Sequence, residues 1–135
     1  MRILLLLFAL AAALPLPAGA GEVVLQRSLP TGAPTGMFAV TVGIPFAPGQ
    51  LDDTKRVALV DGKGRPVPCQ ASVTSRWWSK GGSVQTLLLS FAADTRQERY
   101  VLRYGAGTKP GPAPAHPVTA RAEGDTVVVN TSVLR

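Results

Sequence analysis

The chain has 135 residues, a formal net charge of +6 at pH 7, one cysteine and one histidine. A single cysteine excludes an intramolecular disulfide, and the shortage of His and Cys excludes a zinc site built from these ligands. Cys69 lies in a run whose odd-numbered positions are apolar, so we expect a small buried core residue rather than a reactive thiol.

The first 20 residues have the three parts of a secretory signal peptide. Arg2 supplies a positive charge, residues 3–14 form an unbroken apolar run, and Ala18 and Ala20 occupy the positions that a signal peptidase reads. The run is too short to anchor the chain comfortably across a bilayer. We therefore expect cleavage after Ala20, and a secreted or periplasmic protein that does not associate with a membrane afterwards.

The basic charge, +5 once Arg2 is removed, favours acidic partners such as anionic lipid, nucleic acid or uronate-containing polysaccharide. Export makes nucleic acid the least expected of the three, so no nucleic-acid partner is predicted. The basic residues are scattered along the sequence, which is typical of an ordinary solvated surface.

Four strands are predicted in the first part of the mature chain. Residues 23–27 and 57–60 are short apolar runs, and residues 37–44 alternate between apolar and polar with a period of two. Residues 61–65 contain two glycines, which allow the chain to reverse in a hairpin loop before the next strand near Val67.

Two more strands follow in the sequence. In residues 84–91, Leu87 and Leu89 share one face and Leu88 lies on the other, which is typical of a central strand. In residues 98–104, Tyr100 and every second residue after it form an apolar face. Since no window after the signal has the period of a helix, the predicted class is all-β, a small barrel or sandwich.

Residues 106–117 break this pattern. Their alternating prolines favour polyproline II, so we expect a linker or a long exposed loop. Residues 118–122 and 126–130 are the only strand-like segments that follow, and two strands bury too little to form a core. They either return to the first sheet or begin a further domain that is missing. Residues 127–129 are apolar and β-branched, and we expect them to be a docking edge.

The sequence contains no convincing catalytic set, and neither a metal nor a cofactor is predicted. His116 would have to serve a Ser-His-Asp triad from within the proline linker, where nothing rigid orients it. Asp52 and Asp53 are adjacent carboxylates, but they fit a solvated turn better than a calcium site.

One cluster, Arg76, Trp77, Trp78 and Lys80, is a candidate ligand site. Aromatic rings stack on the apolar faces of sugars, and cations pair with uronate carboxylates. The alternative is structural: one tryptophan closes the end of the barrel and the other covers a neighbouring domain. Because adjacent strand residues point to opposite faces, we do not expect both rings in one core.

Four stretches of sequence carry a family resemblance. They are G-I-P-F-A-P-G-Q-L at 43–51, V-A-L-V-D-G-K-G-R-P-V-P-C-Q at 57–70, R-W then G-S-V within 76–84, and L-L-L-S-F then Y-V-L-R-Y-G within 87–105. Together they resemble the N-terminal domain of the exo-rhamnogalacturonan lyase-like (YetA-like) family. Thr86, Asn130 and Ser132 depart from the family pattern.

The resemblance implies a six-stranded RIFT-type β-barrel over residues 21–105, with residues 118–135 opening a β-sandwich. In that family a large helical toroid follows and holds lyase catalysis, so the implied partners are such downstream domains or a related chain. The expected function is a non-catalytic module of an exported polysaccharide-processing protein. A free-standing carbohydrate-binding module that takes acidic polysaccharide, and a periplasmic structural or adaptor domain, remain alternatives.

Overall fold

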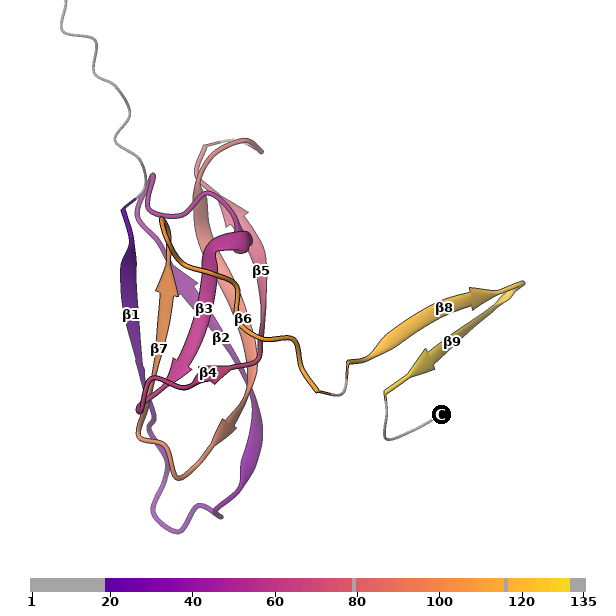
Figure 1. Ribbon diagram of the computed structural model, residues 1–135, viewed down its shortest axis with the longest axis horizontal. Helices are drawn as coiled ribbons and strands as arrows, with labels where there is room; N and C mark the ends of the chain where they lie inside the picture. Colours follow the sequence, from indigo (N-terminus) through magenta and orange to yellow (C-terminus); the bar gives the residue numbers. More distant parts are fainter. Residues whose placement is uncertain (1–18, 79, 116, 132–135) are drawn as a thin grey trace, which may run out of the picture.

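The structure, a computed structural model, describes residues 19–78, 80–115 and 117–131 (Figure 1). The predicted signal peptide falls on residues 1–20, of which 1–18 lie outside the described residues. No helix in the described ranges is long and apolar enough to cross a membrane. The regular elements are, in chain order, β1 (Gly21–Gln26), β2 (Met37–Pro45), the 3₁₀ turn η1 (Thr54–Arg56), β3 (Val57–Asp61), β4 (Pro66–Val67), β5 (Cys69–Arg76), β6 (Val84–Asp94), β7 (Arg99–Tyr104), β8 (Thr119–Glu123) and β9 (Thr126–Asn130).

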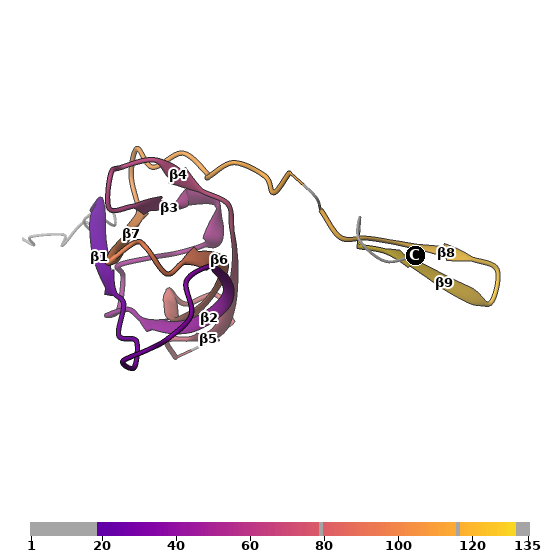
Figure 2. The same ribbon diagram turned by 90° about the horizontal axis from the view of Figure 1, so that it is seen from below.

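The first seven strands form two antiparallel sheets that wrap around one interior (Figure 2). One sheet has the order β1-β7-β3-β4 and the other has the order β2-β6-β5. As expected, the strand over residues 84–91 is central, because β6 pairs with both β2 and β5. The all-β prediction is therefore confirmed.

β4 and β5 are one bent strand that passes from the first sheet to the second. Val67 pairs with Leu59 in one sheet, and Cys69 pairs with Phe91 in the other. Pro68 lies between them, and its missing N–H group interrupts the ladder where the strand changes sheet. Counting this bent strand once gives the six strands that the sequence predicted.

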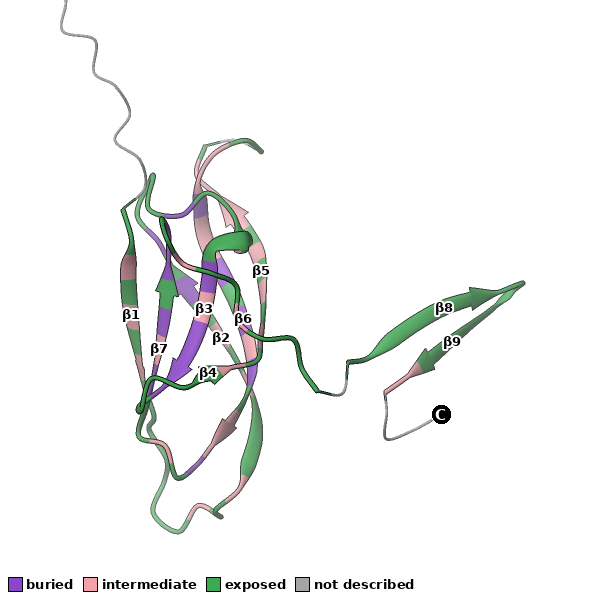
Figure 3. Cartoon of the chain, viewed as in Figure 1, coloured by how far each residue is buried: buried purple, intermediate pink, exposed green. Residues whose placement is uncertain are grey.

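The core lies between the two sheets, where the inward faces of β3, β6 and β7 are buried (Figure 3). Leu59, Leu87, Leu89 and Leu102 are fully buried there, and Leu88 points outward as its position in the alternation requires. Cys69 is only half-buried and packs against this core, so the sequence overestimated its burial. Burial still raises the pKa of its thiol, which disfavours the reactive thiolate.

The turn from β3 to β4 is held by the carboxylate of Asp61. This group accepts backbone N–H bonds from Lys63 and Arg65, both at 2.9 Å, and pairs with the Arg65 guanidinium at 2.7 Å. Burial alone would raise the pKa of Asp61, but these hydrogen bonds outweigh it and hold the pKa below its usual value. Gly64 has a φ of 78°, which its lack of a Cβ permits.

A seam lies between β1 and β2, at the edges of the two sheets that the bent strand does not join. Within the part of the chain that the structure describes, β1 pairs with β7 alone and β2 pairs with β6 alone, so each of the two strands has one edge without a strand partner. The loop over residues 27–36 connects them.

β8 and β9 pair with each other in a separate two-stranded sheet. The segment before them leaves the barrel at Gly105 and runs past β4, where Pro114 and Ala115 line a hollow together with Pro66 and Val67. Beyond that point the hairpin extends away from the barrel (Figure 1). Of the two expectations for these strands, a return to the first sheet is therefore wrong.

Candidate functional site

The candidate site lies in the loop that joins β5 to β6. β5 ends at Arg76, and the Trp77 N–H donates to the Ser83 carbonyl at 2.9 Å to close the base of the loop. Both tryptophans therefore lie beyond the strand, and the argument from alternating strand faces does not apply to them. Their rings instead contact each other, with centroids 5.6 Å apart and planes tilted by 44°.

Trp77 is half-buried and belongs to the end of the barrel. Its Nε1–H donates to the Phe46 carbonyl at 2.9 Å. Phe46 is itself buried and packs edge-on against Tyr104, with ring centroids 4.9 Å apart. Trp77 thus links the loop to the core through a satisfied polar tip and an apolar body.

Trp78 has the opposite environment. The residue is 84 % exposed, and its backbone has a φ of 56°, in the left-handed region that a bulky residue rarely occupies. A conformation of this kind costs on the order of 1–3 kcal/mol, and such residues cluster at active sites, ligand clamps and switch regions.

Arg76, at the end of β5, holds the base of the loop through its guanidinium group. One guanidinium nitrogen, Nη1, donates to the carbonyls of Asp52 at 2.9 Å and Gly82 at 2.8 Å. Among the described residues its Nε and Nη2 groups have no partner. Arg76, Trp78 and Lys80 line one open hollow of about 570 Å³ together with the end of β5.

This hollow combines a bare aromatic ring with two cations. Such a surface can stack on a sugar ring and pair with a carboxylate, but none of its described lining residues carries a carboxylate or imidazole that would move a proton. Within the described ranges, no group of three or more His, Cys, Asp or Glu lies close enough together to hold a metal ion. His116 falls outside the described residues.

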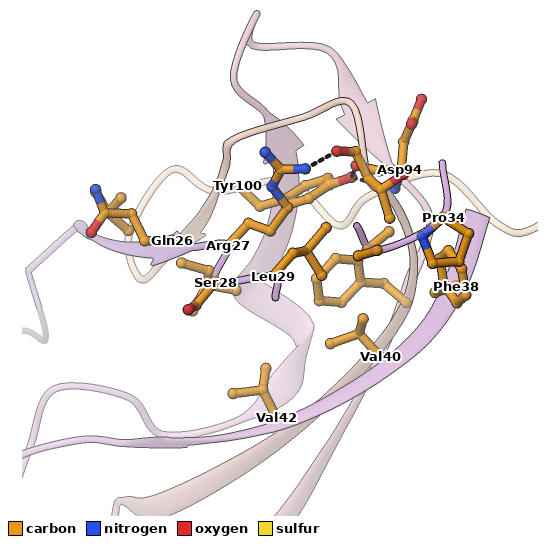
Figure 4. A pocket seen from close by; sticks show the side chains of 16 residues that line it. Gln26, Arg27, Ser28, Leu29, Pro34, Phe38, Val40, Val42, Asp94 and Tyr100 are labelled. Carbon is orange, nitrogen blue, oxygen red and sulfur yellow. Dashed lines mark hydrogen bonds between the residues drawn. The ribbon is translucent and has the colours of Figure 1, made fainter. Parts of the chain in front are cut away.

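A second concave surface was not predicted from the sequence. It is an apolar groove of about 510 Å³ along the seam between β1 and β2, shown from close by in Figure 4. Phe38, Val40 and Val42 line it from β2, Leu29 from the connecting loop, and Tyr100 from β7. The half-exposed Phe38, at the start of an otherwise inward-facing alternation, is the one sequence position that points to it, since β2 extends there beyond the core.

Polar contacts hold the end of the groove together. The Tyr100 hydroxyl accepts a hydrogen bond from the Asp94 N–H at 2.7 Å. An Arg27 guanidinium nitrogen donates to the Thr95 carbonyl, and the Thr95 hydroxyl accepts from the Gly36 N–H at 2.8 Å. The groove is therefore a built part of the barrel, and its charged lining residues are Arg27 and Asp94.

The family model of the PcRGLX-like N-terminal RIFT barrel domain matches residues 24–104, more than half of the chain. The chain belongs to this family. The match confirms the resemblance that the four motifs carried and identifies the two wrapped sheets as a RIFT barrel. It ends at Tyr104, the last residue of β7, so the linker and the β8–β9 hairpin lie outside it. No curated protein and no solved structure gives a significant match.

Proposed function

We propose that this RIFT barrel is a non-catalytic N-terminal module of an exported polysaccharide-processing protein of the rhamnogalacturonan lyase-like family. The observation that carries the proposal is the family match, which covers the N-terminal barrel alone. It is supported by the roles of three acidic side chains in the barrel, which hold turns and a strand pair together.

Asp94 illustrates these roles. Its carboxylate pairs with the Arg96 guanidinium at 2.8 Å, and hydrogen bonds from Arg96 lower its pKa from 3.8 to about 2. Efficient general acid–base catalysis requires a pKa near the working pH, so this carboxylate is tuned away from that task. Asp61 is likewise committed to its turn, and Glu22 pairs with Arg103 across β1 and β7 at 2.9 Å.

The direct test is an assay of the purified chain for lyase activity on rhamnogalacturonan oligosaccharides. Elimination next to a uronate carboxyl leaves a new C=C bond that absorbs in the ultraviolet. We expect no increase in absorbance above that of a buffer control, under conditions where a known lyase turns the same substrate over. An increase that grows with the concentration of the chain would overturn the proposal.

Export is tested separately, because it depends on the first 20 residues. Mass spectrometry of protein recovered from the periplasm or the medium should give a chain that begins at Gly21. Intact Met1 on soluble cytoplasmic protein would contradict this part of the proposal.

Sugar binding by Arg76, Trp78 and Lys80 is a second candidate function. The favouring observation is the conformation of Trp78, whose ring is exposed at the cost of a strained backbone and borders a hollow with two cations. Oligosaccharides that contain uronate fit this surface, since a ring face and a carboxylate are recognised together. Trp77 would then act as a positioning residue behind Trp78.

Titration of the chain with galacturonan-containing oligosaccharides, followed by tryptophan fluorescence, tests this candidate. Trp78→Ala should abolish binding, and Lys80→Gln should weaken binding of acidic oligosaccharides more than of neutral ones. Phe38→Ala, a truncation of another exposed aromatic away from the hollow, is the matched control and should bind normally. Unchanged binding by Trp78→Ala would exclude this surface.

A further inference from the structure

The guanidinium group of Arg76 is fixed to the protein through one of its three nitrogens. Its Nη1 atom donates to the carbonyls of Asp52 at 2.9 Å and Gly82 at 2.8 Å. These carbonyls lie before η1 and in the loop between β5 and β6, so the single nitrogen joins two separate segments. Because the group is planar and rigid, two bonds to Nη1 also restrict where its other two nitrogens lie.

The remaining nitrogens, Nε and Nη2, are available to a ligand. Neither has a partner among the described residues. In that part of the chain, no buried side-chain nitrogen or oxygen of a buried or half-buried residue lacks a hydrogen-bond partner. Arg76 is half-buried, so its two unpartnered nitrogens must reach the surface. Arg76 also lines the open hollow beside Trp78 and Lys80, which gives a ligand a surface from which to approach.

The two free nitrogens have the geometry that fits a carboxylate. The Nε–H and Nη2–H bonds lie along one edge of the guanidinium and are parallel, so each can donate to one of the two carboxylate oxygens. Such charge-assisted bonds are short and roughly twice as strong as hydrogen bonds between neutral groups. Lys80 lines the same hollow, but its ammonium is a point charge that attracts an anion without fixing its orientation.

Trp78 supplies a flat apolar surface in the same hollow. The residue is 84 % exposed, and its ring contacts that of Trp77 at a tilt of 44°. Trp77 is in turn fixed by its hydrogen bond to the Phe46 carbonyl, so it supports the position of Trp78. A ligand that uses both Trp78 and Arg76 needs an apolar ring face and a carboxylate on the same ring, which is the chemistry of a sugar acid.

We propose that Arg76 is the specificity-determining residue of this hollow and pairs, through Nε and Nη2, with the free carboxylate of a sugar acid whose ring stacks on Trp78. The inference rests on the sugar-binding function proposed above and adds which group of the sugar is recognised. A methyl ester of the same sugar keeps the ring but has no negative charge, and its methyl group blocks one of the two oxygens. The hollow should therefore bind the free acid and discriminate against the ester.

The substitution Arg76→Lys separates this role from a structural one. Lysine keeps the positive charge, and its ammonium has enough N–H groups to donate to the carbonyls of Asp52 and Gly82. It has no second edge to offer to a carboxylate. Arg65→Lys is the matched control, because Arg65 pairs with the Asp61 carboxylate through Nε and Nη2 in the β3–β4 turn and is not among the described residues that line the hollow.

The test is a calorimetric titration of the full purified chain with a galacturonate oligosaccharide and with its methyl ester. The unaltered chain should bind the free acid at least about tenfold more tightly, the low end of what hydrogen bonds to a charged group contribute. Arg76→Lys should lose this preference and bind the ester as before, whereas Arg65→Lys should keep it, and a thermal melt shows that each variant has folded. In the unaltered chain, the magnetic resonance signal of the Arg76 Nε–H should shift with the free acid and not with the ester.

The outcomes separate this inference from the function on which it rests. If neither ligand binds, or if Trp78→Ala leaves binding unchanged, the hollow is not a sugar site and both are overturned. If binding depends on Trp78 but the acid and the ester bind equally, the sugar-binding function stands and the role of Arg76 is wrong. The same holds if Arg76→Lys keeps the preference for the acid, and a preference that Lys80→Gln removes instead would assign the recognition of charge to Lys80.

Discussion

Leu89 in β6 gives the sharpest test of the barrel interior, because its neighbour Leu88 is a built-in control. The two leucines are adjacent in the central strand of the second sheet, yet Leu89 is 0 % exposed and Leu88 is 36 % exposed. Leu89→Ala removes side-chain volume from the core, whereas Leu88→Ala removes the same volume from the outer face.

The size of the difference follows from burial. Loss of three buried carbon groups costs about 2.4 kcal/mol in transfer free energy, and the cavity left behind raises the total to about 3–4 kcal/mol. A domain the size of this barrel has a free energy of unfolding of about 4–13 kcal/mol. Leu89→Ala should therefore lower the melting temperature by about 12–30 °C. Leu88→Ala should cost less than about 1 kcal/mol.

Urea denaturation followed by tryptophan fluorescence measures both variants, since Trp77 is half-buried against the barrel end and should change its emission on unfolding. The reasoning predicts a large loss for Leu89→Ala and a small one for Leu88→Ala, with the same dependence on urea concentration. Equal losses, or a larger loss for Leu88→Ala, would show that the inward and outward faces of β6 are assigned wrongly.

Three further predictions concern polar contacts. Tyr100→Phe leaves the Asp94 N–H without its acceptor and should cost about 1–3 kcal/mol in urea denaturation; a neutral result would refute the contact. Trp77→Phe should destabilise the barrel by a similar amount, whereas Trp78→Ala should not. Because the pKa values of Asp61 and Asp94 are lowered in the folded chain, their contribution to stability is present above about pH 4 and is lost as the pH falls toward 2. Asp94→Asn should flatten the fall in melting temperature over this range, and an unchanged fall would exclude its role.

The strands of the barrel were largely predictable because burial in a sheet leaves a local signal. Tyr100, Leu102 and Tyr104 alternate with exposed or half-buried residues in β7, and the structure buries these three side chains. The turn at Asp61 was also predicted, from Gly62 and Gly64 in the loop that follows it. The boundaries moved by one to three residues, as in β6, which continues to Asp94 because its pairing with β2 extends past the buried section.

For the candidate site, the sequence predicted which residues belong to it but not what each of them does. The sequence placed Arg76, Trp77, Trp78 and Lys80 together, but their different roles depend on contacts with distant segments. Trp77 donates to Phe46, 31 residues away, and Arg76 donates to Asp52, 24 residues away. The positive φ of Trp78 could not be predicted either, because a residue other than glycine gives no indication of such a conformation.

The groove could not be predicted from the sequence, because it forms where β1 and β2 lie at the edges of different sheets and do not pair with each other. Phe38 on the inward face of β2 marks one residue of the groove, but the composition of β1 and β2 does not indicate that each strand would pair on one side only. The same holds for the hairpin: its pattern allowed either a return to the first sheet or the start of a further domain, and the structure pairs β8 with β9 in a separate sheet.

The central claim is that residues 21–105 form a barrel that folds without the linker and the β8–β9 hairpin. Thermal unfolding of a chain truncated after Gly105, followed by circular dichroism, tests this most directly. The truncated chain should unfold in one cooperative transition, with a loss of less than about 1 kcal/mol and a melting temperature within about 4–8 °C of the full chain. An unfolded or non-cooperative chain would show that the terminal segments belong to the barrel and would contradict the account.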